Sequence, residues 1–354
     1  MPLLRSIVIA SLMLLSWAML PTRAAAEAAA AEGENCLDCH GEASLELTLE
    51  SGEQRSLFVD AQQFKNSIHG DKLRCTDCHT DIEGYPHPER TFKNLRDFTL
   101  AYYESCKRCH FDNYTKSLDS VHYVYLAKED RHTPLCVDCH GAHDVVRPAV
   151  PKTRISTTCA RCHGEIYRRY AESVHGKALI EGHNGDVPVC TDCHRSHDIQ
   201  DPRTASFHLK TPEMCANCHT DEKLMKKYGL STKVLQTYLQ DFHGMTASFY
   251  SLEQGSPPAP MAVCTDCHGV HDILPVNDPR SSVMKANLLA VCQKCHVGAT
   301  ANFPSAWLSH YEPSPTKAPL VYYVKLFYQI FIPIVVLGLV LQILLHIWRV
   351  VVNR

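Results

Sequence analysis

The 354-residue chain lacks an excess of charge of either sign, since 35 Lys and Arg residues stand against 38 Asp and Glu residues. The formal net charge of -3 leaves no surplus of basic groups to neutralise phosphates, which excludes nucleic acid as a principal partner. The composition, 21% charged and 45% hydrophobic, also excludes a disordered tail and a protein with many membrane spans. Cysteine and histidine are abundant instead, with 18 and 22 residues. Such chains are usually disulfide scaffolds, zinc proteins or haem proteins.

Long apolar runs are scarce and occur at the two ends of the chain. Near the N-terminus, Arg5 precedes a 14-residue apolar run from Ile7 to Leu20, followed by small alanine residues. A basic start, a short apolar core and small residues predict a secretory signal peptide over residues 1–26. The run is shorter than the roughly 20 residues that a membrane span needs, and an uncleaved anchor is the alternative. We therefore expect the protein to be exported.

The C-terminal run differs in its length and in its flanks. Leu326–Trp348 contains 23 residues and no Lys, Arg, Asp or Glu, which is enough to cross a bilayer. Aromatic residues lie at both ends and two arginines follow, as expected beside the cytoplasm. The sequence predicts a single transmembrane helix over residues 322–348 and a cytoplasmic tail over 349–354. Residues 27–315 then form a periplasmic domain, held at the inner membrane by one helix in the lipid bilayer.

All 18 cysteines fall into nine Cys-x-x-Cys pairs, and a histidine directly follows every pair. Zinc sites and disulfides do not require histidine at that fixed position. Cys-x-x-Cys-His is the attachment motif for c-type haem, in which two thioethers hold the porphyrin and the adjacent imidazole binds the iron. We number the motifs 1 to 9 in chain order and expect nine covalently bound haem c groups. The attachment cysteines are Cys36, Cys39, Cys75, Cys78, Cys106, Cys109, Cys136, Cys139, Cys159, Cys162, Cys190, Cys193, Cys215, Cys218, Cys264, Cys267, Cys292 and Cys295. The proximal iron ligands are His40, His79, His110, His140, His163, His194, His219, His268 and His296.

Nine of the other histidines fall into two patterns that alternate with the motifs. Ser-x-His followed by Gly or Tyr, or a looser form of this pattern, predicts distal iron ligands at His69, His122, His175, His243 and His310. Cys-x-x-Cys-His-x-x-His-Asp gives His143, His197 and His271, with His87 at the same relative place after a longer spacer. Equal numbers of proximal and distal candidates favour two histidines at each iron. The alternative is that some of these histidines are surface residues and that methionine or water completes the iron.

The sequence does not assign the distal histidines to individual haems. His143 is too close to His140 in the chain to reach the opposite face of the same haem. We therefore expect the ligands of the His-Asp pattern to serve a neighbouring haem.

The two patterns form an internal repeat, with units over about residues 36–87, 106–144, 159–198, 215–272 and a final half unit over 292–310. The exported segment offers about 32 residues per motif, too few for an ordinary hydrophobic core. We therefore expect a mostly irregular, haem-cored fold of repeated two-haem units with short α-helices, plus one C-terminal transmembrane helix. One helical segment is Lys223–Asp241, with a break near Gly229 and Ser231 as the cap of its second part.

Four histidines remain outside these patterns: His132, His183, His208 and His346. The first three lie in polar, loop-like segments, which indicates a surface position or contact with haem propionates. His346 lies near the cytoplasmic end of the apolar segment, where an ionisable residue is a functional candidate. Three alternatives are open for His346: binding to a b-type haem of a partner, contact with quinone, or extension of its side chain to the membrane surface.

Residues 36–310 resemble the multihaem c-type cytochromes found in the periplasm of anaerobically respiring bacteria. The segment from Phe242-His243-Gly244 through Cys264-x-x-Cys267-His268 to Cys292-x-x-Cys295-His296 is similar to the doubled haem-motif domain of that family. The resemblance implies closely packed haems and outer-sphere electron transfer. Some similar proteins have a C-terminal span fused or bound to a b-type cytochrome that oxidises quinol. With one span here, we expect that subunit to be separate. The small quinol-dehydrogenase cytochromes of nitrate and nitrite respiration differ, because their anchor is N-terminal.

Together these features predict an electron carrier and not an enzyme. The carrier takes electrons from a membrane b-type cytochrome, or from another quinol-oxidising subunit, and passes them to periplasmic cytochromes or terminal reductases. Iron with both axial positions filled transfers electrons without binding substrate. The alternative is a multihaem reductase of nitrite, hydroxylamine or a sulfur oxyanion, which requires at least one open iron. A purely structural zinc or disulfide protein is the third interpretation, and it predicts a colourless protein.

Overall fold

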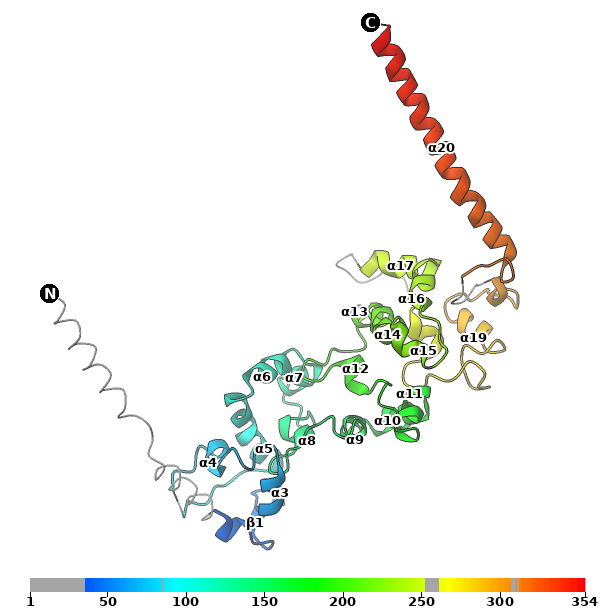
Figure 1. The fold of residues 1–354 in the computed structure, drawn as a ribbon. Coiled ribbons are helices and arrows are strands. Elements are labelled where there is room, and N and C mark those ends of the chain that lie inside the picture. Colours follow the sequence, from blue (N-terminus) through cyan, green and yellow to red (C-terminus); the bar gives the residue numbers. More distant parts are fainter. Residues whose placement is uncertain (1–35, 85, 252–260, 307–309, 311, 354) are drawn as a thin grey trace, which may run out of the picture. The chain divides into compact units, whose positions relative to one another are not determined.

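A computed structural model describes residues 36–84, 86–251, 261–306, 310 and 312–353, as short helices joined by irregular chain (Figure 1). The expected signal peptide lies outside these residues. The chain divides into two compact units. The first unit contains the residues up to 164 together with 189–200, and the second contains 165–188 and 201–354. Motifs 1 to 6 therefore belong to the first unit and motifs 7 to 9 to the second.

The first unit contains a helical turn at residues 36–40 and a small antiparallel hairpin in which Glu46 lies opposite Ser56. Its elements are β1 (Glu46–Thr48), β2 (Gln54–Ser56), α3 (Ala61–Asn66), α4 (Cys75–Cys78), α5 (Leu95–Tyr103), the 3-10 helix η1 (Glu104–Arg108), α6 (Phe111–Leu118), α7 (Val121–Leu126), α8 (Cys136–His140), α9 (Thr153–Ala160) and α12 (Cys190–His194).

The second unit is helical and ends in one long helix. Its elements are α10 (Gly164–Glu172, which begins at the last residue of the first unit), α11 (Val174–Ile180), α13 (Ala205–Leu209), α14 (Thr211–His219), α15 (Glu222–Lys226), α16 (Val234–Leu239), α17 (Phe242–Ser251), α18 (Cys264–His268), α19 (Leu288–Gln293), the 3-10 helix η2 (Pro304–Ala306) and α20 (Pro319–Val352). The expectation of short helices in a largely irregular chain is confirmed, since every other helix named here has ten residues or fewer.

The expected helix over Lys223–Asp241 is interrupted as predicted, but its second part does not begin at Ser231. Helix α15 ends at Lys226, and Gly229 shortly after it has a positive φ of 65°, a conformation that interrupts a helix. Ser231 Oγ accepts the N–H of Lys233 in a local turn, and α16 begins only at Val234. The prediction of Ser231 as helix cap is therefore wrong, because its hydroxyl stabilises the turn before the helix.

The hydrophobic core is small. Among the described residues, the buried hydrophobic side chains are Leu49, Leu135, Leu179, Val189, Ala216, Met225, Tyr238, Ala247, Met261 and Val263. Three of them, Leu135, Val189 and Val263, directly precede the first cysteine of motifs 4, 6 and 8. Much of the buried apolar surface thus lies beside the motifs, as expected for a chain with few residues per motif.

Helix α20 has 34 residues and a mean hydropathy of 2.7 over its most apolar 18-residue window. It contains the predicted span at 322–348 and extends beyond it at both ends. In the part of the chain that the structure describes, α20 alone is long and apolar enough to cross a membrane. This helix is compatible with a single span.

Candidate haem-binding sites

One turn of helix organises the motifs. The N–H of the motif histidine donates to the carbonyl of the first cysteine, as from His79 to Cys75 (2.9 Å), His163 to Cys159 (2.9 Å) and His296 to Cys292 (2.8 Å). Residues i, i+3 and i+4 of a helical turn lie on one side. Two cysteine side chains and an imidazole are thus presented together. This is the donor set that covalent haem attachment requires.

The even-numbered motifs share a cap that the sequence analysis missed. Motifs 2, 4, 6 and 8 form the short helices α4, α8, α12 and α18, and each has aspartate as its third residue: Asp77, Asp138, Asp192 and Asp266. The carboxylate accepts the N–H of the residue before the first cysteine, at 2.8, 2.7, 2.8 and 2.7 Å. Cys-x-Asp-Cys, which occurs in these four motifs and in motif 1, was the sequence signal for this cap. Motifs 3, 5, 7 and 9 instead lie at the end of a preceding helix.

The first distal pattern is a helix N-cap. Ser120 Oγ accepts the N–H of His122 (3.2 Å), and Ser173 Oγ accepts the N–H of Gly176 (3.1 Å). Asp241 does the same for Gly244 (2.9 Å). Serine and aspartate are both strong N-cap residues. The looser match at Asp241 is therefore the same device, which places the following histidine in the first turn of a helix.

The glycine after several distal histidines allows a close approach of main chain. A Cβ at Gly176 would lie 1.9 Å from the carbonyl oxygen of Tyr170. A Cβ at Gly70 would lie 2.1 Å from the carbonyl oxygen of Phe64, and one at Gly244 would lie 2.0 Å from that of Tyr238. No side chain fits there, so glycine holds the turn that carries the histidine against the preceding helix.

Eight of the predicted proximal histidines each lie opposite one predicted distal histidine. Within the first unit the pairs are His40–His87, His69–His110, His79–His143, His122–His163 and His140–His197. Within the second unit they are His175–His219, His243–His296 and His268–His310. Each pair joins one proximal candidate to one distal candidate, and the partners come from distant parts of the sequence.

The ring separation is nearly constant across these eight pairs. Ring centroids are 6.1 to 6.4 Å apart, whereas the angle between the ring planes varies from 11° to 60°. Ordinary aromatic pairs spread over about 4.5–7 Å. An imidazole nitrogen lies about 2.0 Å from a metal that it binds and about 1.1 Å from its own ring centroid. Two imidazoles on opposite sides of one metal therefore have centroids about 6.2 Å apart. A common metal axis fixes the distance and leaves each ring free to rotate, so these residues fit a haem iron bound by two histidines.

The pairs follow a rule that the sequence did not show. His143 lies with His79 and His197 with His140, so these candidates of the His-Asp pattern lie opposite the preceding even-numbered motif. His69, His122, His175 and His243 face the next odd-numbered motif. His87 and His310, at the two ends of the series, face motifs 1 and 8. His194 and His271 belong to different units, and their roles remain predictions from the sequence.

Burial favours the neutral form of several of these imidazoles. Desolvation lowers the pKa of His175 to about 4, and it also lowers the pKa of His79, His122 and His143. A neutral imidazole has the electron pair that a metal ligand needs. Among the described residues, no group of three or more His, Cys, Asp or Glu side chains converges as a zinc site would require. The arrangement is therefore one of opposed pairs.

His208 has a partner that the sequence analysis did not foresee. Its Nε2 lies 2.9 Å from Oδ2 of Asp266, the cap of motif 8. Basic side chains lie beside other caps, with Arg96 3.5 Å from Asp138 and Lys152 3.7 Å from Asp192. His208 therefore belongs to the surroundings of a motif and is not an isolated surface residue.

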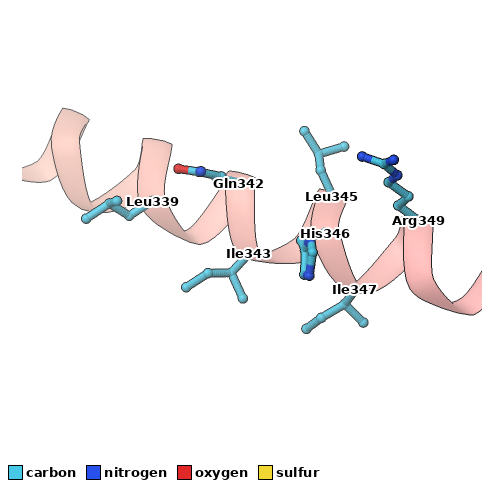
Figure 2. A pocket seen from close by; sticks show the side chains of 7 residues that line it. All are labelled: Leu339, Gln342, Ile343, Leu345, His346, Ile347 and Arg349. Carbon is cyan, nitrogen blue, oxygen red and sulfur yellow. The ribbon is translucent and has the colours of Figure 1, made fainter.

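Figure 2 shows Gln342, His346 and Arg349 on α20 among apolar side chains that include Leu339 and Ile343. All of these residues come from one helix, so the structure encloses no site around His346. The proposed contact of His346 with a partner haem or with quinone remains a prediction.

Part of the chain matches a known protein family. Residues 130–220, which contain motifs 4 to 7, match the family model for cytochrome c3. No curated protein and no solved structure matches the chain. The cytochrome c3 family implies covalently bound haem c and electron transfer, and together with the motif geometry this match supports a multihaem c-type cytochrome.

Proposed function

We propose that the protein is a membrane-anchored carrier that passes electrons among nine covalently attached haem c groups. The nearly constant separation in eight pairs of histidines carries the proposal. When bound, haem c supplies an iron that alternates between Fe(III) and Fe(II). The cysteines hold each porphyrin, the motif histidine binds one face of the iron, and a distal histidine closes the other face.

Closed axial positions favour a carrier over an enzyme. A reductase of nitrite, hydroxylamine or a sulfur oxyanion needs an iron with an open position for its substrate. The distal imidazoles occupy that position in the arrangement proposed here. Histidine on both faces, rather than methionine on one, also favours a low reduction potential, which suits anaerobic respiration.

We propose further that α20 anchors the protein in the inner membrane, with the haem domain in the periplasm. The donor is then a membrane b-type cytochrome or another quinol-oxidising subunit, and the acceptors are periplasmic cytochromes or terminal reductases. Support comes from the apolar length of α20 and from its tyrosine and tryptophan residues near the membrane surfaces.

Carbon monoxide tests the closed axial positions. The haem-loaded full chain is purified in detergent, reduced with dithionite and exposed to carbon monoxide, which binds ferrous iron only where a position is open. We expect the absorption spectrum to stay unchanged, and no consumption of nitrite, hydroxylamine or sulfite. Carbon monoxide binding to one haem per chain, together with turnover of one of these substrates, would favour the reductase.

Quinol reduction tests the separate donor. Membranes that contain the chain and its native partners should reduce the haems on addition of a quinol, whereas the purified chain should not. Equally fast reduction of the purified chain by quinol would show that it needs no separate quinol-oxidising subunit.

A further inference from the structure

We propose that the haem sites within each unit form a single unbranched file in sequence order, motifs 1 to 6 in the first unit and motifs 7 to 9 in the second. This inference rests on the proposed function, because it concerns the order of the sites between which electrons pass. The sequence patterns leave that order open. Two kinds of contact between motifs, which alternate along the chain, establish it.

The first kind of contact joins an odd-numbered motif to the even-numbered motif that follows. In each case the first cysteines of the two motifs are close neighbours: Cys36 and Cys75, Cys106 and Cys136, Cys159 and Cys190, Cys215 and Cys264. Proximal histidines also interact across three of these contacts, His40 with His79, His110 with His140 and His219 with His268. The attachment points of the two haems are therefore adjacent.

The second kind of contact joins an even-numbered motif to the next odd-numbered motif. The second cysteine of the even motif lies within electrostatic range of cysteines of the next one, as Cys78 does of Cys106 and Cys109, and Cys139 of Cys162. Cys267 lies beside Cys292 in the second unit. These contacts use the other attachment point of the even-numbered haem, so motifs 2, 4 and 8 each meet one neighbour on each side.

A basic residue inside the odd motif fixes this second contact. Arg108 donates from Nη1 to the main-chain carbonyl of Asp77 at 2.9 Å. Arg161 donates to the carbonyl of Asp138 in the same way. Lys294 interacts with Cys267 at the corresponding place in the second unit.

These residues also form a charge pattern along the chain. The third residue of motifs 2, 4, 6 and 8 is aspartate, and that of motifs 3, 5 and 9 is Arg108, Arg161 and Lys294. Motif 1, which follows no other motif, has Asp38 in this position. A cation thus occurs in three of the four odd motifs that follow an aspartate-capped even motif, and motif 7, the first motif of the second unit, has Asn217 instead. Opposite charges attract where motifs 3, 5 and 9 meet the motif before them.

The cysteine contacts described above all join motifs that are consecutive in the chain. An interior site then has two neighbouring sites and a terminal site has one. Electrons entering at one end of a unit pass every site before they leave at the other. A branched array would instead let electrons pass around an interior site.

Anomalous diffraction at the iron edge tests the order in the haem-loaded full chain. We expect nine iron positions, with the irons of motifs 1 to 6 and of motifs 7 to 9 each forming an unbranched series in motif order. Nine irons with a branch within a unit, or with nearest neighbours that are not consecutive motifs, would overturn the file and leave the proposed function intact. Fewer than nine irons would contradict the proposed function itself.

A pair of matched variants tests the contact in solution. Arg161→Gln removes the bond to motif 4, and Arg154→Gln, in the same helical region, is the control. We expect nine haems in both variants, and altered spin coupling of two ferric signals in Arg161→Gln alone. Arg108→Gln should change a different pair of signals, those of motifs 2 and 3. Spectra of Arg161→Gln and Arg108→Gln identical to that of the control would overturn the proposed role of the basic residues.

Discussion

Individual histidines have two roles that depend on their surroundings. Desolvation lowers the pKa of distal candidates such as His122 and His175, so that their imidazoles stay neutral and available to iron. By contrast, His132 lies in a turn where its own N–H donates to Asp130. The pairing of rings, rather than the abundance of histidine, therefore supports the choice of sixteen histidines as candidate iron ligands.

Replacing one distal ligand should change one haem. His122→Met substitutes a thioether opposite His163, and methionine ligation raises the reduction potential. We expect nine attached haems, with one of them shifted upward by a fraction of the roughly 0.8 V range that axial ligands span. Spectroelectrochemical titration measures the shift. His132→Met is the matched control and should leave all nine potentials unchanged, and an unchanged titration in His122→Met would contradict its assignment as a ligand.

At the scale of helices, caps and close approaches determine where the histidines lie. Ser120, Ser173 and Asp241 begin helices two residues before a distal histidine. Aspartates such as Asp138 cap the even motifs from within. Each cap is worth about 0.5–2 kcal/mol, a large contribution where the hydrophobic core is small.

Gly176 should tolerate no side chain. A Cβ there would meet the carbonyl oxygen of Tyr170, and Gly176→Ala should destabilise the protein by about 1–3 kcal/mol through overpacking. The nearby Gly185 has no atom within 4 Å of an added Cβ, so Gly185→Ala should change stability by less than about 0.5 kcal/mol. Urea unfolding followed by circular dichroism compares the two variants. Equal midpoints would show that the close approach does not restrict this position.

Much of the site follows from short-range patterns, and the pairing does not. Cys-x-x-Cys-His and Ser-x-His-Gly are local, because one helical turn and one N-cap are formed by neighbouring residues. The partner of His79 is His143, and that of His69 is His110. Such pairs depend on how the chain returns on itself, which no local pattern encodes. Ser231 shows a similar limit. A serine that stabilises a turn and a serine that caps a helix look the same in the sequence, and here the hydroxyl stabilises the turn.

At the scale of the whole molecule, the haem domain and α20 are proposed to have separate roles. Deleting Leu326–Arg354 removes most of the apolar helix but none of the motifs. We expect the shortened protein to appear in the soluble periplasmic fraction with its full haem content and reversible redox chemistry. Immunoblots of the soluble and membrane fractions, with the full chain as control, give the result. Continued attachment to the membrane after the deletion would contradict the anchor.

The central claim is that two histidines, one on each face, occupy both axial positions of every haem iron. Low-temperature EPR of the oxidised, haem-loaded full chain, with a haem count on the same sample, tests it most directly. We predict nine haems per chain and ferric signals that are all low-spin. A high-spin signal worth one haem would show an open iron and contradict the account.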